Sequence, residues 1–123
     1  STLVPDHFYV GNDRYRERFI QAMGAHVPAD KIEAYFTAQC LTDSVMAHQI
    51  NLHSDKALNF IVAGSFHTDF RDATIERLEK ITNSQIHTFK FASESLNTSE
   101  EITNFKKYDQ NYGHYADYII VTK

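Results

Sequence analysis

The 123-residue sequence predicts an α/β fold in which a helical hairpin is followed by a small parallel or mixed sheet containing a strand–helix–strand unit. In the first part of the chain, apolar residues recur at spacings of three and four, as along one face of a helix. After residue 58 they form short β-branched runs separated by a helical stretch, which is the pattern of parallel strands. We expect a single domain over 1–123, with the hairpin at 12–53 and the α/β part at 58–122.

Each helix of the hairpin has a recognisable beginning. Asn12 can cap a short helix that ends at Gly24. Asp30, with Glu33 three residues later, forms a start like a capping box for a longer helix to about Asn51. Because a short turn joins the two helices, we expect them to lie side by side.

Three strands are expected after the hairpin, at 58–63, 86–91 and 117–122. The first is an uncharged run that ends at Gly64, and we expect it to be buried on both faces. A helix capped by Thr68 or Asp69 and running through Ile81 should connect it to the second strand, and a short helix capped by Thr98 and Glu101 should precede the third. Three strands make a thin sheet, whose open edges would need cover from another segment or chain.

Composition excludes several classes of protein. The formal net charge is −4, and no basic cluster exceeds the pair Lys106 and Lys107, so nucleic acid is not an expected partner. No apolar run approaches the ~20 residues of a membrane-spanning helix. The single cysteine, Cys40, excludes an internal disulfide.

The sharpest local feature is a histidine, His67, three residues after the glycine that ends the first expected strand. Ligands of open α/β sheets bind beyond the carboxyl ends of the strands, which is where His67 is expected. Its imidazole could therefore ligate a metal, hold a carboxylate or relay a proton. It could equally be an ordinary hydrogen-bonding side chain. On the long helix, Gln39 and Asp43 share a face, and Asp43 could orient His67. The alternative is that Gln39 and Asp43 form a buried polar link between helix and loop.

The hairpin is rich in rings that bind iron. Tyr15, His26 and Tyr35 fall on it and Tyr9 lies just before it, and a tyrosinate or imidazole on such a helical element suits ferric haem as an axial ligand. Each ring alone could instead be part of the core or of the surface.

Three segments, taken in order, resemble the ChaN-like haem-binding proteins of bacterial iron uptake. They are Ala38-Gln39 with Thr42-Asp43 and Met46-Ala47, then Phe60 to His67 with its glycine-x-x-histidine ending, then Ala116-Asp117-Tyr118. The order and spacing of these pieces are more specific than any one of them. The resemblance is good from Asp30 to Thr122 and loose over the first helix.

The resemblance implies an α/β fold related to the erythromycin-esterase and Tiki groups. It also implies a lipoprotein of the cell envelope that binds haem, as a cofacial pair within a dimer in the best-known member. There a tyrosine holds the iron, and a histidine of the other subunit contacts the propionates. Gln39, Asp43, Met46, Gly64 and His67 match the family motif, whereas no motif fixes the tyrosine.

The predicted haem-binding residues are therefore Tyr15, His26 and Tyr35 from the hairpin, together with His67. Family members are about twice as long and carry an earlier glycine-acid-x-histidine motif, so the chain resembles the carboxyl-terminal half of the family fold. The family's usual glycines after the histidine are also replaced here by Thr68-Asp69-Phe70-Arg71.

We therefore expect a non-catalytic haem-binding protein of bacterial iron uptake, with haem, a second copy of the chain and a haem receptor of the outer membrane as partners. One alternative is half of a metal-dependent hydrolase site of the erythromycin-esterase or Tiki type, centred on His67 and Asp43. Another is a structural fragment that needs its missing half to fold.

Overall fold

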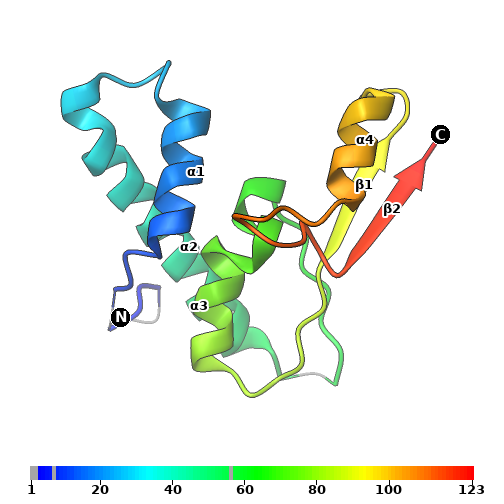
Figure 1. Ribbon diagram of the computed structural model, residues 1–123. Helices are drawn as coiled ribbons and strands as arrows, with labels where there is room; N and C mark the ends of the chain where they lie inside the picture. The colour runs from blue at the N-terminus through cyan, green and yellow to red at the C-terminus, as the bar shows by residue number, and fades with distance from the viewer. Residues whose placement is uncertain (1–2, 7, 56) are drawn as a thin grey trace.

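The computed structural model describes residues 3–6, 8–55 and 57–123, and it has a mixed α/β architecture. The helices are α1 (Asp13–Met23), α2 (Ile32–His53), α3 (Ala73–Ile81) and α4 (Ser99–Lys106), and the strands are β1 (Phe89–Ser93) and β2 (Tyr118–Thr122). Short 3-10 turns lie at Ala29–Lys31, Ser65–His67 and Asp69–Arg71. Figure 1 shows the α1–α2 hairpin and the β1–α4–β2 segment as two arms that diverge from the region of α3.

The hairpin is confirmed, with one difference at the start of its second helix. The side chain of Asn12 accepts a hydrogen bond from the Tyr15 amide, and Gly24 follows the last residue of α1. The predicted capping box at Asp30 is wrong, because α2 begins after a 3-10 turn without a side-chain cap. The carboxylate of Glu33 instead pairs with Arg16 of α1 and so is not available to the helix start.

The predicted strand at 58–63 is wrong in both form and burial. This segment has no regular secondary structure, and Phe60 and Val62 are 86% and 98% exposed. A strand exists only where a neighbour completes its backbone hydrogen bonds. In the part of the chain that the structure describes, β1 pairs only with β2, and nothing forms a ladder with 58–63.

The strand–helix–strand unit does form, but one element later than predicted. β1 and β2 pair in parallel, in register from Phe89 opposite Tyr118 to Ser93 opposite Thr122, and α4 connects them. The predicted cap of α4 is confirmed, because Thr98 and Glu101 form a reciprocal capping box. The second predicted strand begins three residues late, at Phe89, and the described sheet has two strands instead of three.

The predicted helix over 69–81 is broken near its start. Phe70, Arg71 and Ala73 have φ values of +62°, +56° and +56°, a left-handed region that costs a side chain about 1–2 kcal/mol per residue. Interactions with other elements hold this backbone: the Phe70 amide donates to the Tyr115 carbonyl, and Arg71 pairs with Asp117 at 2.8 Å. As a result, α3 begins only at Ala73.

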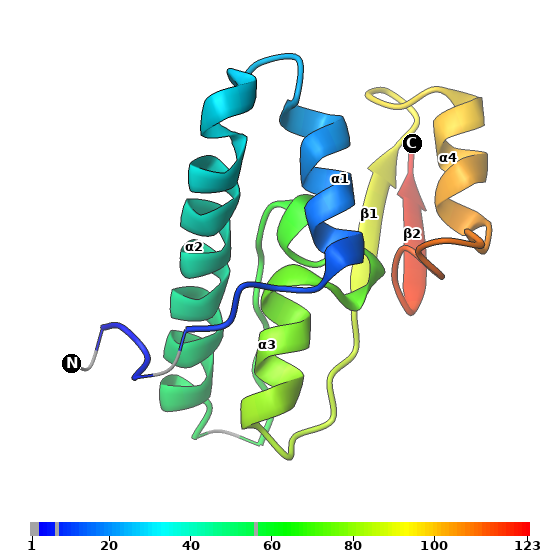
Figure 2. The ribbon, with the colours of Figure 1, turned by 60° about the vertical axis from the view of Figure 1, so that its left-hand side comes forward.

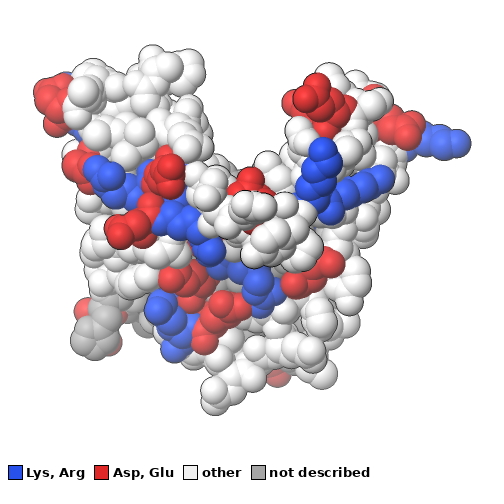
Figure 3. All heavy atoms as spheres, viewed as in Figure 1, with Lys and Arg blue, Asp and Glu red and all other residues white. Residues whose placement is uncertain are grey.

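The hydrophobic core lies where α1, α2 and the start of α3 meet. Figure 2 shows these three elements side by side. Its buried members are Tyr15, Phe19, Phe36, Cys40 and Ala73, and Phe66 packs against them. On the face shown in Figure 3, acidic and basic side chains are intermingled. Among the described residues, no helix has the length and apolar character needed to cross a membrane.

Candidate functional site

A buried carboxylate, Asp43, lies at the centre of the candidate site. Its side chain is 0% exposed and accepts three hydrogen bonds from three different elements. The donors are the Tyr15 hydroxyl at 2.7 Å from Oδ2, and His67 Nδ1 at 2.7 Å and the Thr74 hydroxyl at 2.8 Å from Oδ1. The predicted pairing of Asp43 with His67 is therefore confirmed.

The local structure explains how these side chains converge. Asp43 lies in the middle of α2, Tyr15 in the first turn of α1 and Thr74 in the first turn of α3. His67 closes the 3-10 turn that follows Gly64, and its amide donates to the Gly64 carbonyl at 2.9 Å. Gly64 has a φ of −57°, which any residue adopts, so this turn does not need the conformational freedom of glycine.

Tyr15 is a hydrogen-bond donor held inside the protein. Its side chain is 0% exposed, and its ring packs against Phe36 and Phe66. Burial, and then the hydrogen bond to Asp43, raise the pKa of Tyr15, so the phenol keeps its proton. Its oxygen also accepts a hydrogen bond from Gln39 Nε2 at 3.2 Å.

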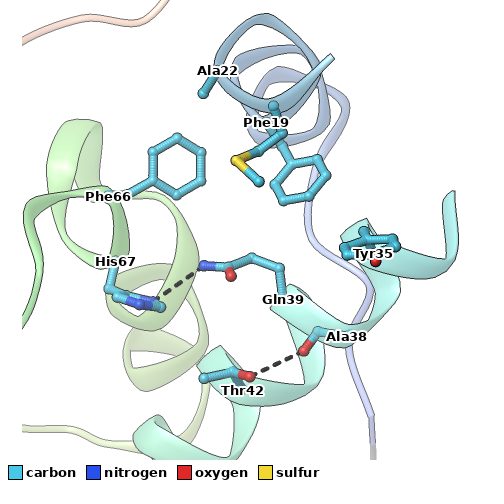
Figure 4. Close-up of a pocket in the computed structure, with 9 residues that line it drawn as sticks. Phe19, Ala22, Tyr35, Ala38, Gln39, Thr42, Phe66 and His67 are labelled. Atoms are coloured by element: carbon cyan, nitrogen blue, oxygen red, sulfur yellow. Dashed lines mark hydrogen bonds between the residues drawn. The ribbon is translucent and has the colours of Figure 1, made fainter. Parts of the chain in front are cut away.

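A hollow of about 450 Å³ lies beside this cluster, between α1, α2 and the turn that carries His67. Its volume falls within the range of about 300–1,000 Å³ that is typical of small-molecule sites. In Figure 4, Gln39 and His67 point toward each other within the group of lining side chains, and Tyr35 lies one turn nearer the start of α2. The lining consists of Phe19, Ala22, Met23, Tyr35, Ala38, Gln39, Thr42, Phe66 and His67.

The structure separates the four predicted haem-binding residues into two groups. Tyr35 and His67 both line the hollow, and Tyr35 is 51% exposed. Tyr15 does not line it, because its hydroxyl faces Asp43 in the interior. His26 is exposed in the turn after α1 and is likewise not part of the lining.

The matched motif residues have different roles in the packing. Gln39 links the hollow to Tyr15, whereas Met46 does not line the hollow and has its sulfur 3.9 Å from the Thr74 hydroxyl. Sequence reasoning missed Thr74 and Phe66. Phe66 is an aromatic residue inside an otherwise polar turn, which was a usable signal, but nothing in the sequence marks Thr74. Within the described residues, no three His, Cys, Asp or Glu side chains are grouped as for a metal ion.

Comparison with known proteins identifies the family. A family model described as haem-binding uptake, Tiki superfamily, ChaN matches residues 1–78, which is more than half of the chain. The match includes α1, α2 and the turn with His67, and it ends before β1. No curated protein and no solved structure matches the chain. The chain therefore belongs to the ChaN family of haem-binding uptake proteins in the Tiki superfamily.

Proposed function

We propose that this protein binds haem in the hollow between α1, α2 and the Ser65–His67 turn, and that it does so without catalysing a reaction. The observation that carries the proposal is the lining of this hollow. It combines a largely apolar surface with one tyrosine and one histidine, Tyr35 and His67. The family's description supplies the identity of the ligand.

The residues present fit a haem group. A porphyrin is a flat apolar ring, and Met23 at the end of α1 and Phe66 in the Ser65–His67 turn offer partly exposed apolar surface to it. Bound haem would supply an iron ion that accepts axial ligands from a phenolate or an imidazole. Both ligand types line the hollow, in Tyr35 and His67.

Tyr35 is a better candidate ligand than Tyr15. The Tyr35 side chain is half exposed on the hollow, and no described residue is hydrogen-bonded to its hydroxyl. Tyr15, by contrast, would have to leave a fully buried position and give up its hydrogen bond to Asp43 before it could reach iron. We therefore assign the predicted tyrosine ligand to Tyr35.

The proposal extends to assembly and cellular context. We propose that two copies bring their hollows together around a cofacial pair of haems, because one open hollow covers only part of a porphyrin. The word uptake in the family description supports a role in the cell envelope, where the protein would exchange haem with a receptor in the outer membrane. Sedimentation with and without haemin tests the dimer: a monomer under both conditions would contradict it.

A haemin titration read by absorbance tests the ligand. Tyr35→Phe should weaken binding and change the spectrum of bound haemin. Tyr108→Phe is the matched control, since Tyr108 is also exposed, at 64%, but does not line the hollow. Equal effects of the two substitutions, or a loss only in Tyr15→Phe, would contradict the assignment.

One observation favours a second candidate function. The Asp43–His67 pair has the arrangement of a carboxylate that orients a metal-bound or proton-accepting imidazole, as in half of a hydrolase site. Hydrolysis of an activated ester in the presence of zinc, lost in His67→Ala, would support this alternative over a non-catalytic role.

A further inference from the structure

We propose that Tyr15 and Thr74 are positioning residues that act through Asp43 to fix His67 in one tautomer. In that tautomer the ring proton is on Nδ1, and Nε2 presents an electron pair to the hollow. With haem bound in the hollow, His67 contacts the iron and not a propionate. This last step rests on the proposed function.

The hydrogen-bond directions around Asp43 carry the first step. A carboxylate only accepts hydrogen bonds, so a ring nitrogen 2.7 Å from Oδ1 must hold the proton between them. The Thr74 hydroxyl shares Oδ1, and the Tyr15 hydroxyl occupies Oδ2. With both oxygens engaged by donors from α1 and α3, the carboxylate plane is fixed, and with it the orientation of the imidazole.

The hydrogen bonding of Gln39 is consistent with a proton on His67 Nδ1. Its Nε2 atom lies 3.4 Å from His67 Nδ1, but that nitrogen already donates to Asp43, so two donors would face each other there. The amide instead donates to the Tyr15 oxygen at 3.2 Å. Tyr15 thus accepts from Gln39 and donates to Asp43, which fixes the direction of its hydroxyl proton toward the carboxylate.

The other ring nitrogen of His67 is available to a ligand. Among the residues that the structure describes, none is hydrogen-bonded to Nε2, and the side chain is 23% exposed where it lines the hollow. An unprotonated imidazole nitrogen binds a metal ion or accepts a hydrogen bond. An ionised propionate has only acceptor oxygens and would need an imidazolium with a proton on Nε2 as its partner, whereas haem iron accepts the electron pair of the neutral ring.

The first experiment measures the tautomer directly, in the chain without haemin. The two ring nitrogens of a neutral histidine differ in 15N chemical shift according to which one is protonated, and His67→Ala assigns the resonances. We expect His67 to carry its proton on Nδ1. A proton on Nε2 in the unsubstituted chain would overturn the proposal.

Substitutions then test the positioning residues. Tyr15→Phe and Thr74→Val should each produce a mixture of tautomers, and Thr74→Ser should restore the single one. Tyr9→Phe is the matched control, because Tyr9 also donates to a carboxylate, Glu76 at 2.9 Å, but lies away from His67. If His67 keeps a single tautomer in Tyr15→Phe, as it should in Tyr9→Phe, Tyr15 is not a positioning residue.

The second experiment tests the contact with iron. In resonance Raman spectra of the haemin complex, a vibration between iron and the histidine nitrogen should shift when histidine is labelled with 15N, and it should be lost in His67→Ala. Bound haemin without this band would overturn the iron step while the proposed function stands. Failure to bind haemin at all would overturn both, and the tautomer would still be decided by the first experiment.

Discussion

Two buried carboxylates, Asp43 and Asp72, are both 0% exposed, yet their surroundings differ. Asp72 is paired with two arginines, Arg14 at its Oδ1 and Arg18 at its Oδ2. Asp43 faces two hydroxyl groups and one imidazole, and no arginine or lysine forms an ion pair with it among the described residues. Asp72 is held within a network of permanent charges, whereas every partner of Asp43 is neutral or can become so.

The difference separates a structural cluster from a functional one. Arginine cannot give up its proton in a protein, so the Asp72 cluster has a single state and ties α1 to the start of α3. The Asp43 cluster includes an imidazole at the edge of a hollow, where the electronic state of the ring affects what can bind. The following predictions test this separation, from the largest expected effect to the smallest.

Asp72→Ala should cause the largest loss of stability. It would leave Arg18, which is 7% exposed, without its carboxylate, and breaking a buried ion pair on one side costs about 3–5 kcal/mol. Urea denaturation followed by circular dichroism measures the change, with Glu100→Ala as the exposed control. A loss below about 1 kcal/mol would show that Asp72 is not a structural anchor.

Asp43→Ala should cost less stability but should remove haem binding. Its three donors lose one acceptor, and hydrogen bonds left unmade in the interior cost about 1–3 kcal/mol. The measurements are the same urea series and a haemin titration at a temperature where the variant is folded. Unchanged haemin affinity would place Asp43 with Asp72 as a purely structural residue.

Alkaline pH should weaken the Asp43 cluster. The pKa of Tyr15 is raised above its ordinary value of 10 by burial and by the bond to Asp43, so the unfolded chain loses this proton first. Stability should therefore fall as pH rises above 10. Cys40, whose pKa burial raises from 9 to about 11, adds to the loss from pH 9, and Tyr9, raised to about 12, adds to it above pH 10.

The measurement for this effect is the urea midpoint at pH 8.5 and pH 11. The difference should be smaller in Tyr15→Phe than in the unsubstituted chain, because phenylalanine has no proton to lose. If Tyr15→Phe leaves the pH dependence unchanged, the buried phenol does not contribute to it.

The smallest effect concerns Ala73, the residue between Asp72 and Thr74 that joins the two clusters. Its φ of +56° is strained for alanine, and glycine relieves about 1–2 kcal/mol of that strain. Glycine also adds about 0.5–1 kcal/mol of unfolded-chain entropy and removes a buried methyl group worth about 0.8 kcal/mol, so Ala73→Gly should be close to neutral. Ala47→Gly, at a buried position inside α2, is the control and should destabilise the protein. A comparable loss at both positions would show that the turn is not strained.

The sequence predicted those parts of the structure that depend on local patterns. The α1 cap at Asn12, the capping box of α4 and the link from Asp43 to His67 all followed from spacing. The segment 58–63 was predicted wrongly, because its composition is that of a buried strand but strand formation depends on a partner. The interruption of the predicted helix at Phe70 is held by long-range contacts that no local pattern reveals. The Phe70 amide donates to the Tyr115 carbonyl, and Arg18 donates to the Asp69 carbonyl and lies over the Phe70 ring.

The sequence predicted the kinds of side chain at the site but not which tyrosine lines the hollow. The sequence indicated iron-binding rings on the hairpin, but it could not tell a buried tyrosine from an exposed one. Tyr15 and Tyr35 both follow the helical apolar pattern, and only the packing of Phe36 and Phe66 around Tyr15 distinguishes them. Thr74 belongs to the site because α3 packs against α2, which brings the Thr74 hydroxyl to Asp43.

The most direct test of the central claim is a haemin titration of a chain whose hollow has been filled. Ala38 is exposed and lines the hollow, so Ala38→Trp should occupy the space without disturbing the buried Asp43 cluster. Ala34→Trp, one turn earlier on the same helix and outside the lining, is the matched control. We predict that Ala38→Trp loses haemin binding at least tenfold while Ala34→Trp retains it, which corresponds to about 1.4 kcal/mol or more. Equal haemin affinity in the two variants would contradict a haem site in this hollow.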